Sequence, residues 1–130
     1  MTSTRPPLTP EQLAYIAGGS EWQELDSVWL YFDQPLGYPF LPHALDTFVE
    51  RREGFLWTLK RLLEHGHIRL LWWTDKSLVT GTPEEQVDII RQAFPEDDEG
   101  MEEGLWFYPV GCPVGVIWQW PGRNPIPFTE

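Results

Sequence analysis

The sequence predicts an α+β domain, with three to four helices packed on a small antiparallel sheet formed mainly by the C-terminal half. Helix signals fill residues 9–65, β-rich runs gather in residues 67–120, and no repeat or heptad is present. The 130 residues are 42% hydrophobic and 15% aromatic, which suits one core. We expect a single domain over residues 9–121, a flexible lead over 1–8, and an irregular proline-rich tail over 122–130.

The N-terminal part predicts two short helices in succession. In the first, Thr9 is the N-cap, and Gly18 and Gly19 are the stop. The second restarts at once with Ser20 as its cap, and an apolar stripe at spacings of three and four follows over residues 22–32. The stripe consists of Trp22, Leu25, Trp29 and Phe32.

The middle of the chain predicts a loop followed by a long amphipathic helix. Residues 33–43 hold three prolines and a glycine, so we expect mostly extended backbone there. The helix is expected from about His43 to His65, with a wide apolar face interrupted at Arg52. Gly66 supplies the left-handed residue that ends it.

The C-terminal half begins with a strand signal at residues 67–73, which is short and rich in β-branched and aromatic residues. A turn and a brief return strand over 78–80 follow. Thr82, a proline at the next position and Glu85 form a capping-box signature, which predicts a helix that ends near Phe94. Its buried residues should be Val87, Ile90 and Phe94, with Ile89 at the edge of the apolar face.

Two more β-rich runs lie near the C-terminus, at residues 105–110 and 115–120. They are separated by a short Gly-Cys-Pro segment, so we expect them to pair as an antiparallel hairpin with their prolines at its ends. Alternation along the first run would turn Trp106 and Tyr108 outward and Phe107 into the core.

An acidic segment lies between the last helix and this predicted hairpin, with six carboxylates within eight positions. Like charges at this density repel one another and weaken the folded state. One interpretation is a solvated loop that keeps the protein soluble. The other is a recognition patch in which carboxylates steer a basic partner and aromatic rings anchor it. The candidate partner-binding residues are Glu96, Asp97, Asp98, Glu99, Glu102, Glu103, Trp106 and Tyr108.

The overall charge restricts the partners. Nine Lys and Arg residues against twenty Asp and Glu residues give a formal charge of −11. Such a field repels phosphate backbones, so we expect no nucleic-acid binding and favour a basic protein partner. No apolar run reaches membrane-spanning length, no targeting signal begins the chain, and the single cysteine excludes an intrachain disulfide. We expect a cytoplasmic protein with no membrane partner.

Catalytic and metal signatures are weak. His65 and His67 have a spacing that can place two imidazoles together, but no cysteine cluster completes a zinc site, and histidines favoured by the dipole at a helix C-terminus are the preferred explanation. Cys112 lies in an acidic neighbourhood that disfavours a thiolate. We therefore expect no catalytic residue, no metal and no cofactor. An enzyme with a carboxylate site in the C-terminal half remains an alternative.

Three stretches carry a resemblance to a known group of proteins: FLWTLKRLLEHGHIRL, GTPEEQVDIIRQAFP and EEGLWFYPVGCPVGVIW. They resemble a family of small acidic bacterial proteins of uncharacterised domain type, over roughly residues 43–120. Some of those proteins are encoded beside contact-dependent or polymorphic toxins and serve as their immunity proteins. The resemblance implies a non-enzymatic cytoplasmic inhibitor that binds a cognate toxin domain, often a basic nuclease. It brings no catalytic residues, and it does not single out the acidic segment. The alternative binding function is a small adaptor or chaperone-like protein for a basic client.

Overall fold

The computed structural model describes residues 8–20, 22–33, 47–108 and 111–119. Within these ranges the chain forms four α-helices, one 3-10 helix and two strands. In chain order they are α1 (Pro10–Ser20), α2 (Leu25–Asp33), α3 (Phe48–Glu64), β1 (Ile68–Trp72), α4 (Pro83–Ala93), η1 (Glu99–Phe107) and β2 (Val114–Trp118). The predicted α+β class, with a small antiparallel sheet in the C-terminal half, is confirmed.

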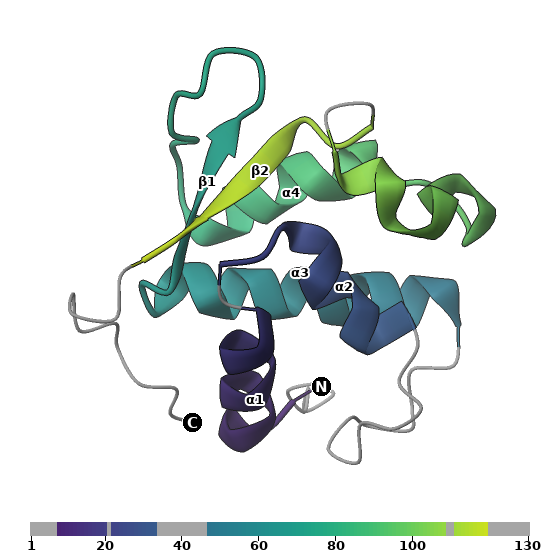
Figure 1. Cartoon of the computed structure of the whole chain (residues 1–130), viewed down its shortest axis with the longest axis horizontal. Coiled ribbons are helices and arrows are strands. Elements are labelled where there is room, and N and C mark those ends of the chain that lie inside the picture. Colours follow the sequence, from purple (N-terminus) through teal and green to yellow (C-terminus); the bar gives the residue numbers. More distant parts are fainter. Residues whose placement is uncertain (1–7, 21, 34–46, 109–110, 120–130) are drawn as a thin grey trace, which may run out of the picture.

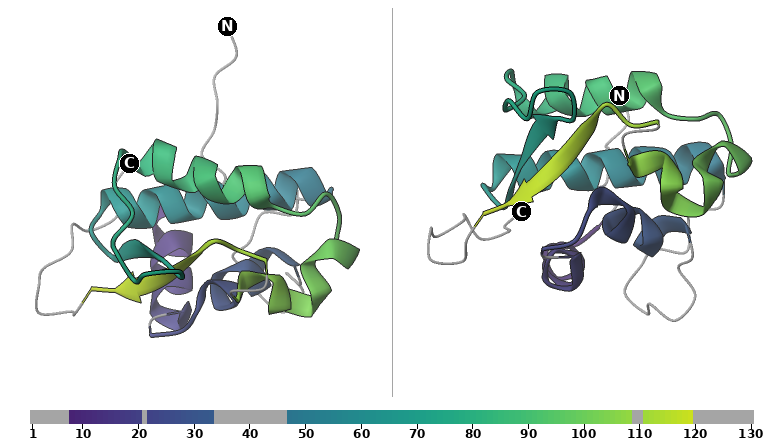
Figure 2. Two further views of the ribbon diagram at one scale, coloured as in Figure 1. Left: turned by 90° about the horizontal axis from the view of Figure 1, so that it is seen from above. Right: turned by 45° about the horizontal axis from the view of Figure 1, so that its top comes forward.

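Helices α3 and α4 pack side by side and run in opposite directions (Figure 1). The two strands cross this pair on one side, and α2 and η1 lie on that same side (Figure 2). Helix α1 packs against α2 at the edge of the molecule. The arrangement places α2 and η1 in direct contact, although they are far apart in the sequence.

Both long helices begin at capping boxes. In α3 the Glu50 amide donates to the Thr47 hydroxyl oxygen at 3.0 Å, and the Thr47 amide donates to the Glu50 carboxylate at 2.9 Å. The expected start near His43 is wrong, because Thr47 has extended dihedral angles and the helix begins at Phe48. In α4 the same reciprocal bonds join Thr82 and Glu85, as the sequence predicts.

The boundary between the first two helices also differs from the expectation. Helix α1 continues through its glycines to Ser20, which is buried at the end of α1 and does not cap α2. Helix α2 begins only at Leu25. A Cβ at Gly19 would collide with the hydroxyl of Tyr31, so this glycine lets α1 and α2 approach closely and does not stop a helix.

The expected hairpin between residues 105–110 and 115–120 is wrong. Strand β2 instead pairs with β1, in an antiparallel register that runs from Ile68 opposite Trp118 to Trp72 opposite Val114. Residues 105–107 belong to η1, because burial of the Trp106 and Phe107 rings against the helices outweighs the local β-propensity of this run. The brief return strand after β1 is present as one bridge between Leu71 and Leu78. Residue 120 lies outside the described residues.

The core is an aromatic cluster centred on Trp29, which is 2% exposed. Its indole ring lies 5.5 Å from the rings of both Phe55 and Phe94, and 6.3 Å from that of Phe107. These rings come from α3, the end of α4 and η1, so one side chain of α2 contacts three other elements. Val87, Ile90 and Phe94 are buried as predicted. Leu8 is also buried, so the core includes the last residue of the predicted flexible lead.

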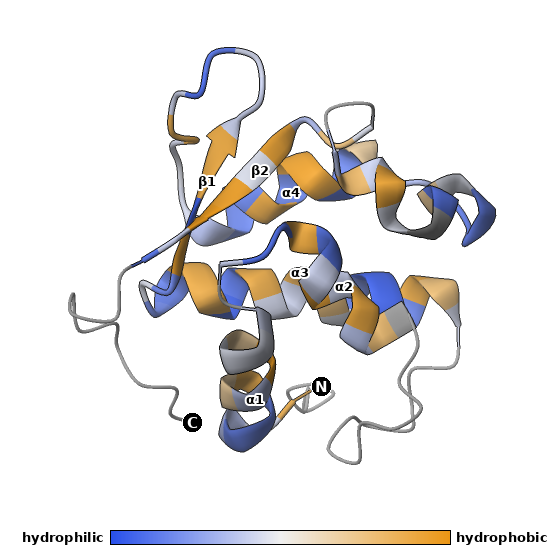
Figure 3. Ribbon diagram, in the orientation of Figure 1, coloured by the Kyte–Doolittle hydropathy of each residue, from blue (hydrophilic) through white to orange (hydrophobic). Residues whose placement is uncertain are grey.

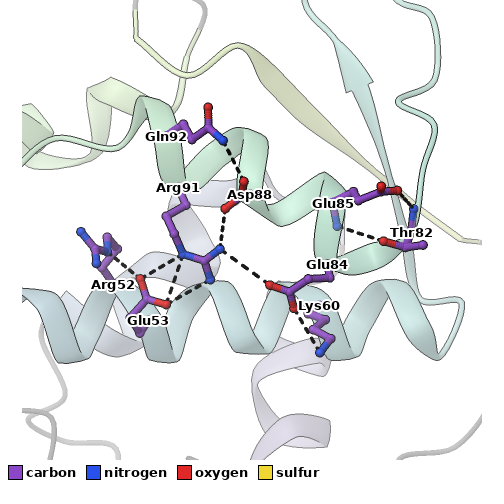
Figure 4. A network of polar contacts seen from close by, with 9 residues as sticks. All are labelled: Arg52, Glu53, Lys60, Thr82, Glu84, Glu85, Asp88, Arg91 and Gln92. Carbon is purple, nitrogen blue, oxygen red and sulfur yellow. Dashed lines mark hydrogen bonds and ion pairs between the residues drawn. The ribbon is translucent and has the colours of Figure 1, made fainter.

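An ion-pair network joins α3 to α4 (Figure 4). Arg91 donates to both carboxylate oxygens of Glu53 and, at 2.8 Å, to Asp88. Lys60 pairs with Glu84 at 3.2 Å, and Arg52 pairs with Glu53 at 2.8 Å. Burial alone would raise the pKa of Glu53, but the hydrogen bonds from Arg91 and Arg52 outweigh it and lower that pKa. The acidic residues of this face are therefore largely neutralised by neighbouring cations.

Replacing Phe55 tests the aromatic core. Phe55 is fully buried among Trp29, Phe94 and Phe107. Phe55→Ala should lower the free energy of unfolding by about 3–5 kcal/mol, because it removes a large apolar side chain and leaves a cavity. Val49→Ala, on the exposed face of the same helix, should change it by less than about 0.5 kcal/mol. Urea denaturation followed by far-ultraviolet circular dichroism measures both, and equal losses would contradict this core.

Replacing Glu53 tests the network between α3 and α4. The lowered pKa of Glu53 means that its stabilisation is present above the unfolded value near 4.5 and is lost as pH falls through the folded value. Glu53→Gln should lower the free energy of unfolding by about 1 kcal/mol at neutral pH, a modest value because solvent screens the pair. The difference from the wild type should shrink on titration towards pH 3. Glu11→Gln removes the same charge from α1 and should show neither effect; a pH-independent Glu53→Gln difference would contradict the account.

Candidate functional site

The acidic segment forms the turn between α4 and η1, and two of its carboxylates have structural roles. Both oxygens of Asp98 accept hydrogen bonds from the Arg51 guanidinium, at 3.0 and 3.1 Å. This bidentate pair ties the segment to α3, and the Arg51 side chain is only 14% exposed. An oxygen of Asp97 accepts from the Gly100 amide at 3.0 Å, which closes the turn that leads into η1.

The other described carboxylates of the segment face solvent. Glu96, Glu99 and Glu102 are exposed, and none forms an ion pair with any residue the structure describes. Figure 3 shows this end of the molecule as hydrophilic, in contrast to the apolar strands. The side chain of Glu103 lies outside the described part of the chain. Glu102 (φ 49°) and Gly104 (φ 96°) have left-handed backbone, so η1 is a succession of tight turns.

The expectation that Trp106 faces outward is wrong. Its side chain is 7% exposed, and its ring centroid lies 4.9 Å from that of Phe94. A Cβ on Gly111 would collide with the same indole, so the chain packs closely over it. In η1, Trp106 and Phe107 are both buried, because alternation between faces requires a strand and this segment is helical. Tyr108, which follows η1, remains 36% exposed.

Tyr108 lies at a pocket of about 370 Å³ between α2 and η1. The pocket brings Gly104 and Tyr108 together with residues around the beginning of α2 that the sequence analysis did not select as site residues, and none of the six carboxylates of the acidic segment is among its described lining residues. The lining residues that matter for its chemistry are Trp22, Glu24, Asp26, Leu30, Gly104 and Tyr108. Trp22 and Leu30 are exposed, by 53% and 44% respectively.

The polar groups of the pocket are acidic. The Tyr108 hydroxyl donates to a carboxylate oxygen of Asp26 at 3.4 Å. Burial and the negative charge of Asp26 raise the pKa of Tyr108, so the phenol stays protonated at neutral pH. Oε1 of Glu24 is buried, and the described residues provide no hydrogen-bond partner for it. A buried acceptor without a donor is unfavourable, and the negative charge of Glu24 also contributes to the raised pKa of Tyr108, which places this carboxylate near the phenol.

The positions of Lys, Arg and His along the sequence indicate which segments form this acidic pocket. Residues 6–42 and 92–122 contain no Lys, Arg or His, and these two segments include both walls. The Lys and Arg residues that the structure describes are Arg51, Arg52, Lys60, Arg61, Arg69, Lys76 and Arg91, on α3, β1, the turn after β1, and α4. Five of them form ion pairs with acidic residues. The fold thus separates a charge-neutralised face from an acidic one.

A second pocket, of about 290 Å³, has the opposite character. It lies where α3, β1 and α4 meet, and its lining consists of Arg69, two glutamines and uncharged residues. It therefore provides no carboxylate for a basic partner.

His65 and Cys112 occupy structural positions. His65 is buried, and its Nδ1 lies 2.9 Å from the Arg61 carbonyl oxygen, where it donates a hydrogen bond at the end of α3. Cys112 is 1% exposed, and burial raises its pKa to about 11. In the part of the chain that is described, no three His, Cys, Asp or Glu residues are arranged to hold a metal ion.

Comparisons with known proteins identify relatives without an assigned function. A family described as "Protein of unknown function, DUF596" matches residues 63–124, which include η1 and exclude α2. The chain is also similar to a solved structure of an uncharacterised protein conserved in bacteria, from Neisseria meningitidis. That similarity has a TM-score of 0.66 at 24% identity and covers 88% of this chain and 82% of the other, which supports a shared fold. No curated protein matches the chain. Among the described helices, none is both long and apolar enough to cross a bilayer.

The environment of Cys112 predicts an inert thiol. Because its pKa is about 11 and its side chain is buried, almost no accessible thiolate exists at pH 8. The native protein should react with a colorimetric disulfide reagent at least about 100-fold more slowly than the same protein in denaturing urea. Absorbance of the released thiolate measures both rates. Rapid reaction of the native protein would contradict the packing described around β2.

Proposed function

We propose that this chain is a non-enzymatic immunity protein that binds a basic bacterial toxin domain and neutralises it by steric and electrostatic occlusion. The observation that carries the proposal is the acidic face made by α2 and η1. Glu24 and Asp26 at the beginning of α2, and Glu96, Glu99 and Glu102 in and just before η1, lack ion pairs among the described residues. This set revises the sequence-based one, because Trp106 is buried and Asp98 is paired with Arg51.

The physical basis is charge complementarity. Unpaired carboxylates on one face raise the rate at which a basic protein meets that face in the right orientation. A nuclease that binds phosphate backbones has cations at its substrate surface, and carboxylates can occupy the places of the phosphates. Tyr108 and Trp22 provide exposed aromatic surface beside these charges, which is the composition typical of interface anchors.

The face of α3 and α4 is less suited to this role. Its carboxylates Glu53, Glu84 and Asp88 already pair with Arg91 or Lys60, so they give little net field. A partner that used them would have to break contacts that join the two helices. The proposal therefore assigns the toxin to the α2–η1 face and places its action in the cytoplasm, where such an inhibitor would meet a toxin that enters the cell.

The first experiment is capture of the partner. Tagged protein expressed in the native bacterium should retain a single stoichiometric basic protein, encoded by a neighbouring gene and identified by mass spectrometry. Many weakly bound proteins released by moderate salt would instead favour the adaptor function, since such binding is micromolar and screened. Absence of any retained protein would contradict both.

A triple variant tests the acidic segment directly. Glu96→Gln, Glu99→Gln and Glu102→Gln together remove three exposed charges and no described contact. The association rate with the captured partner should fall about 10-fold at low salt, and its salt dependence should flatten. Stopped-flow fluorescence measures this rate. The control removes three charges elsewhere, through Glu11→Gln, Asp75→Asn and Glu84→Gln, and should leave the rate within about 2-fold. Equal effects of the two triples would contradict a role for this particular face.

A further inference from the structure

We propose that the pocket between α2 and η1 binds a guanidinium group, presented by a protein partner as an arginine side chain. The inference starts from the chemistry of the pocket: two carboxylates, one of them with a desolvated oxygen that lacks a donor, beside exposed aromatic surface. Neither the sequence motifs nor the family match assigns a ligand to these residues. The pocket is lined by residues of this chain around α2 and the end of η1, so its affinity for guanidinium can be measured without any partner.

The charge balance of the pocket favours a cation. Glu24 and Asp26 bring two negative charges to the beginning of α2. The dipole of α2 offsets only about half an elementary charge at that end, so a net negative charge remains. The described part of either wall holds no Lys, Arg or His. The Tyr108 hydroxyl already donates to Asp26, whereas the Glu24 carboxylate has no hydrogen-bond or ion-pair partner among the described residues.

The aromatic part of the pocket suits a flat cation. Trp22 has φ 69°, a left-handed conformation that is unusual and unfavourable for a large side chain. The indole of Trp22 is 53% exposed at the pocket, whereas those of Trp29, Trp106 and Trp118 are buried. Tyr108 is also partly exposed there. Aromatic faces attract cations, and a guanidinium can stack on a ring while it donates to a carboxylate in the same plane.

Other ligands fit less well. An ammonium group is a compact, strongly hydrated charge that does not stack, so it would leave the aromatic surface unused. Calcium requires six to eight oxygen ligands, and the two carboxylates with one phenol fall short of this number. An anion is excluded by the charge of both walls. Guanidinium is the common biological group that combines positive charge, a planar shape and several donors.

The assignment of a protein as the source of this arginine rests on the proposed function. The α2–η1 face that should meet a basic partner contains this pocket, with Glu24 and Asp26 on one wall and Gly104 and Tyr108 on the other. A single arginine inserted between them would be desolvated on several sides. Buried, well-packed arginines are among the residues that contribute most to protein interfaces.

The test uses the full chain, labelled with ¹⁵N, and follows the indole N–H signals of its tryptophans by nuclear magnetic resonance. Trp22→Phe identifies the signal of Trp22. The probe is N-acetyl-arginine methylamide, which resembles an arginine within a protein. We expect a saturable shift of the Trp22 signal with a dissociation constant of about 1–10 mM, as suits one small group. The probe N-acetyl-citrulline methylamide has nearly the same shape without the charge and should give no saturable shift.

Matched variants locate the binding. Glu24→Gln and Asp26→Asn should each weaken binding of the arginine probe at least about 10-fold, whereas Glu11→Gln, on α1, should leave it unchanged. Circular dichroism and thermal unfolding establish that each amide variant is folded. No saturable shift up to about 100 mM probe would overturn the proposal. So would equal binding of the citrulline or lysine analogue, or full binding by folded Glu24→Gln. Free arginine that binds more than about 10-fold tighter than the probe would overturn a protein source and favour a metabolite.

These outcomes are separate from those of the proposed function. If a basic partner is captured but the probe does not bind, the partner uses the acidic face without this pocket. If the probe binds as expected and no basic protein is captured, the assignment of this pocket to a guanidinium group is supported, and the arginine that it binds does not come from a toxin.

Discussion

The contact of Trp29 with the phenylalanine rings around it is the constraint on which the rest of the structure depends. Phe55 and Phe94 fix its position relative to α3 and α4, and Phe107 draws η1 against α2. Large buried rings contribute most of the apolar area available to a domain of this size, so these elements cannot separate without a large loss of stability. Once the inner faces of α2 and η1 meet at Trp29, their outer faces must lie next to each other. The acidic face is thus a consequence of how the core is packed.

Carboxylates concentrated on one face repel one another and lower the stability of the folded state. Contacts to some of these carboxylates reduce that repulsion. Asp98 is paired with Arg51, and Asp97 closes a turn, so only part of the acidic segment is left to repel. The other cations of α3 and α4, which are Arg52, Lys60, Arg61 and Arg91, are matched with acids on these two helices. A loop that served solubility alone would need neither this separation nor a pocket with an unsatisfied carboxylate at its edge. The arrangement is easier to explain if a basic partner completes it.

The sequence predicted the features that depend on neighbouring residues, and it did not predict those that depend on contacts between distant parts of the chain. Helix α4 was predicted almost to the residue because its capping box, proline and apolar period are all local. The box of α3 at Thr47 is equally local, but apolar residues before it extended the predicted helix too far. The partner of β2 could not be deduced, since nothing in a strand's own residues specifies which distant strand it joins. The exposed acids near η1 were visible in the sequence. Glu24 and Asp26 join them only through tertiary packing, and the absence of cations from residues 6–42 and 92–122 was the one signal that pointed to them.

The most direct measurement is hydrogen–deuterium exchange on this protein, alone and bound to the basic protein it retains from its own cells. The account predicts that protection on binding is concentrated at the start of α2, around Trp22 to Leu30, and in the segment from Glu96 to Tyr108. The paired helices α3 and α4 should exchange on their outer face as they do in the free protein. Protection confined to α3 and α4, with α2 and η1 unchanged, would contradict the claim that the acidic face made by the core is the surface that binds.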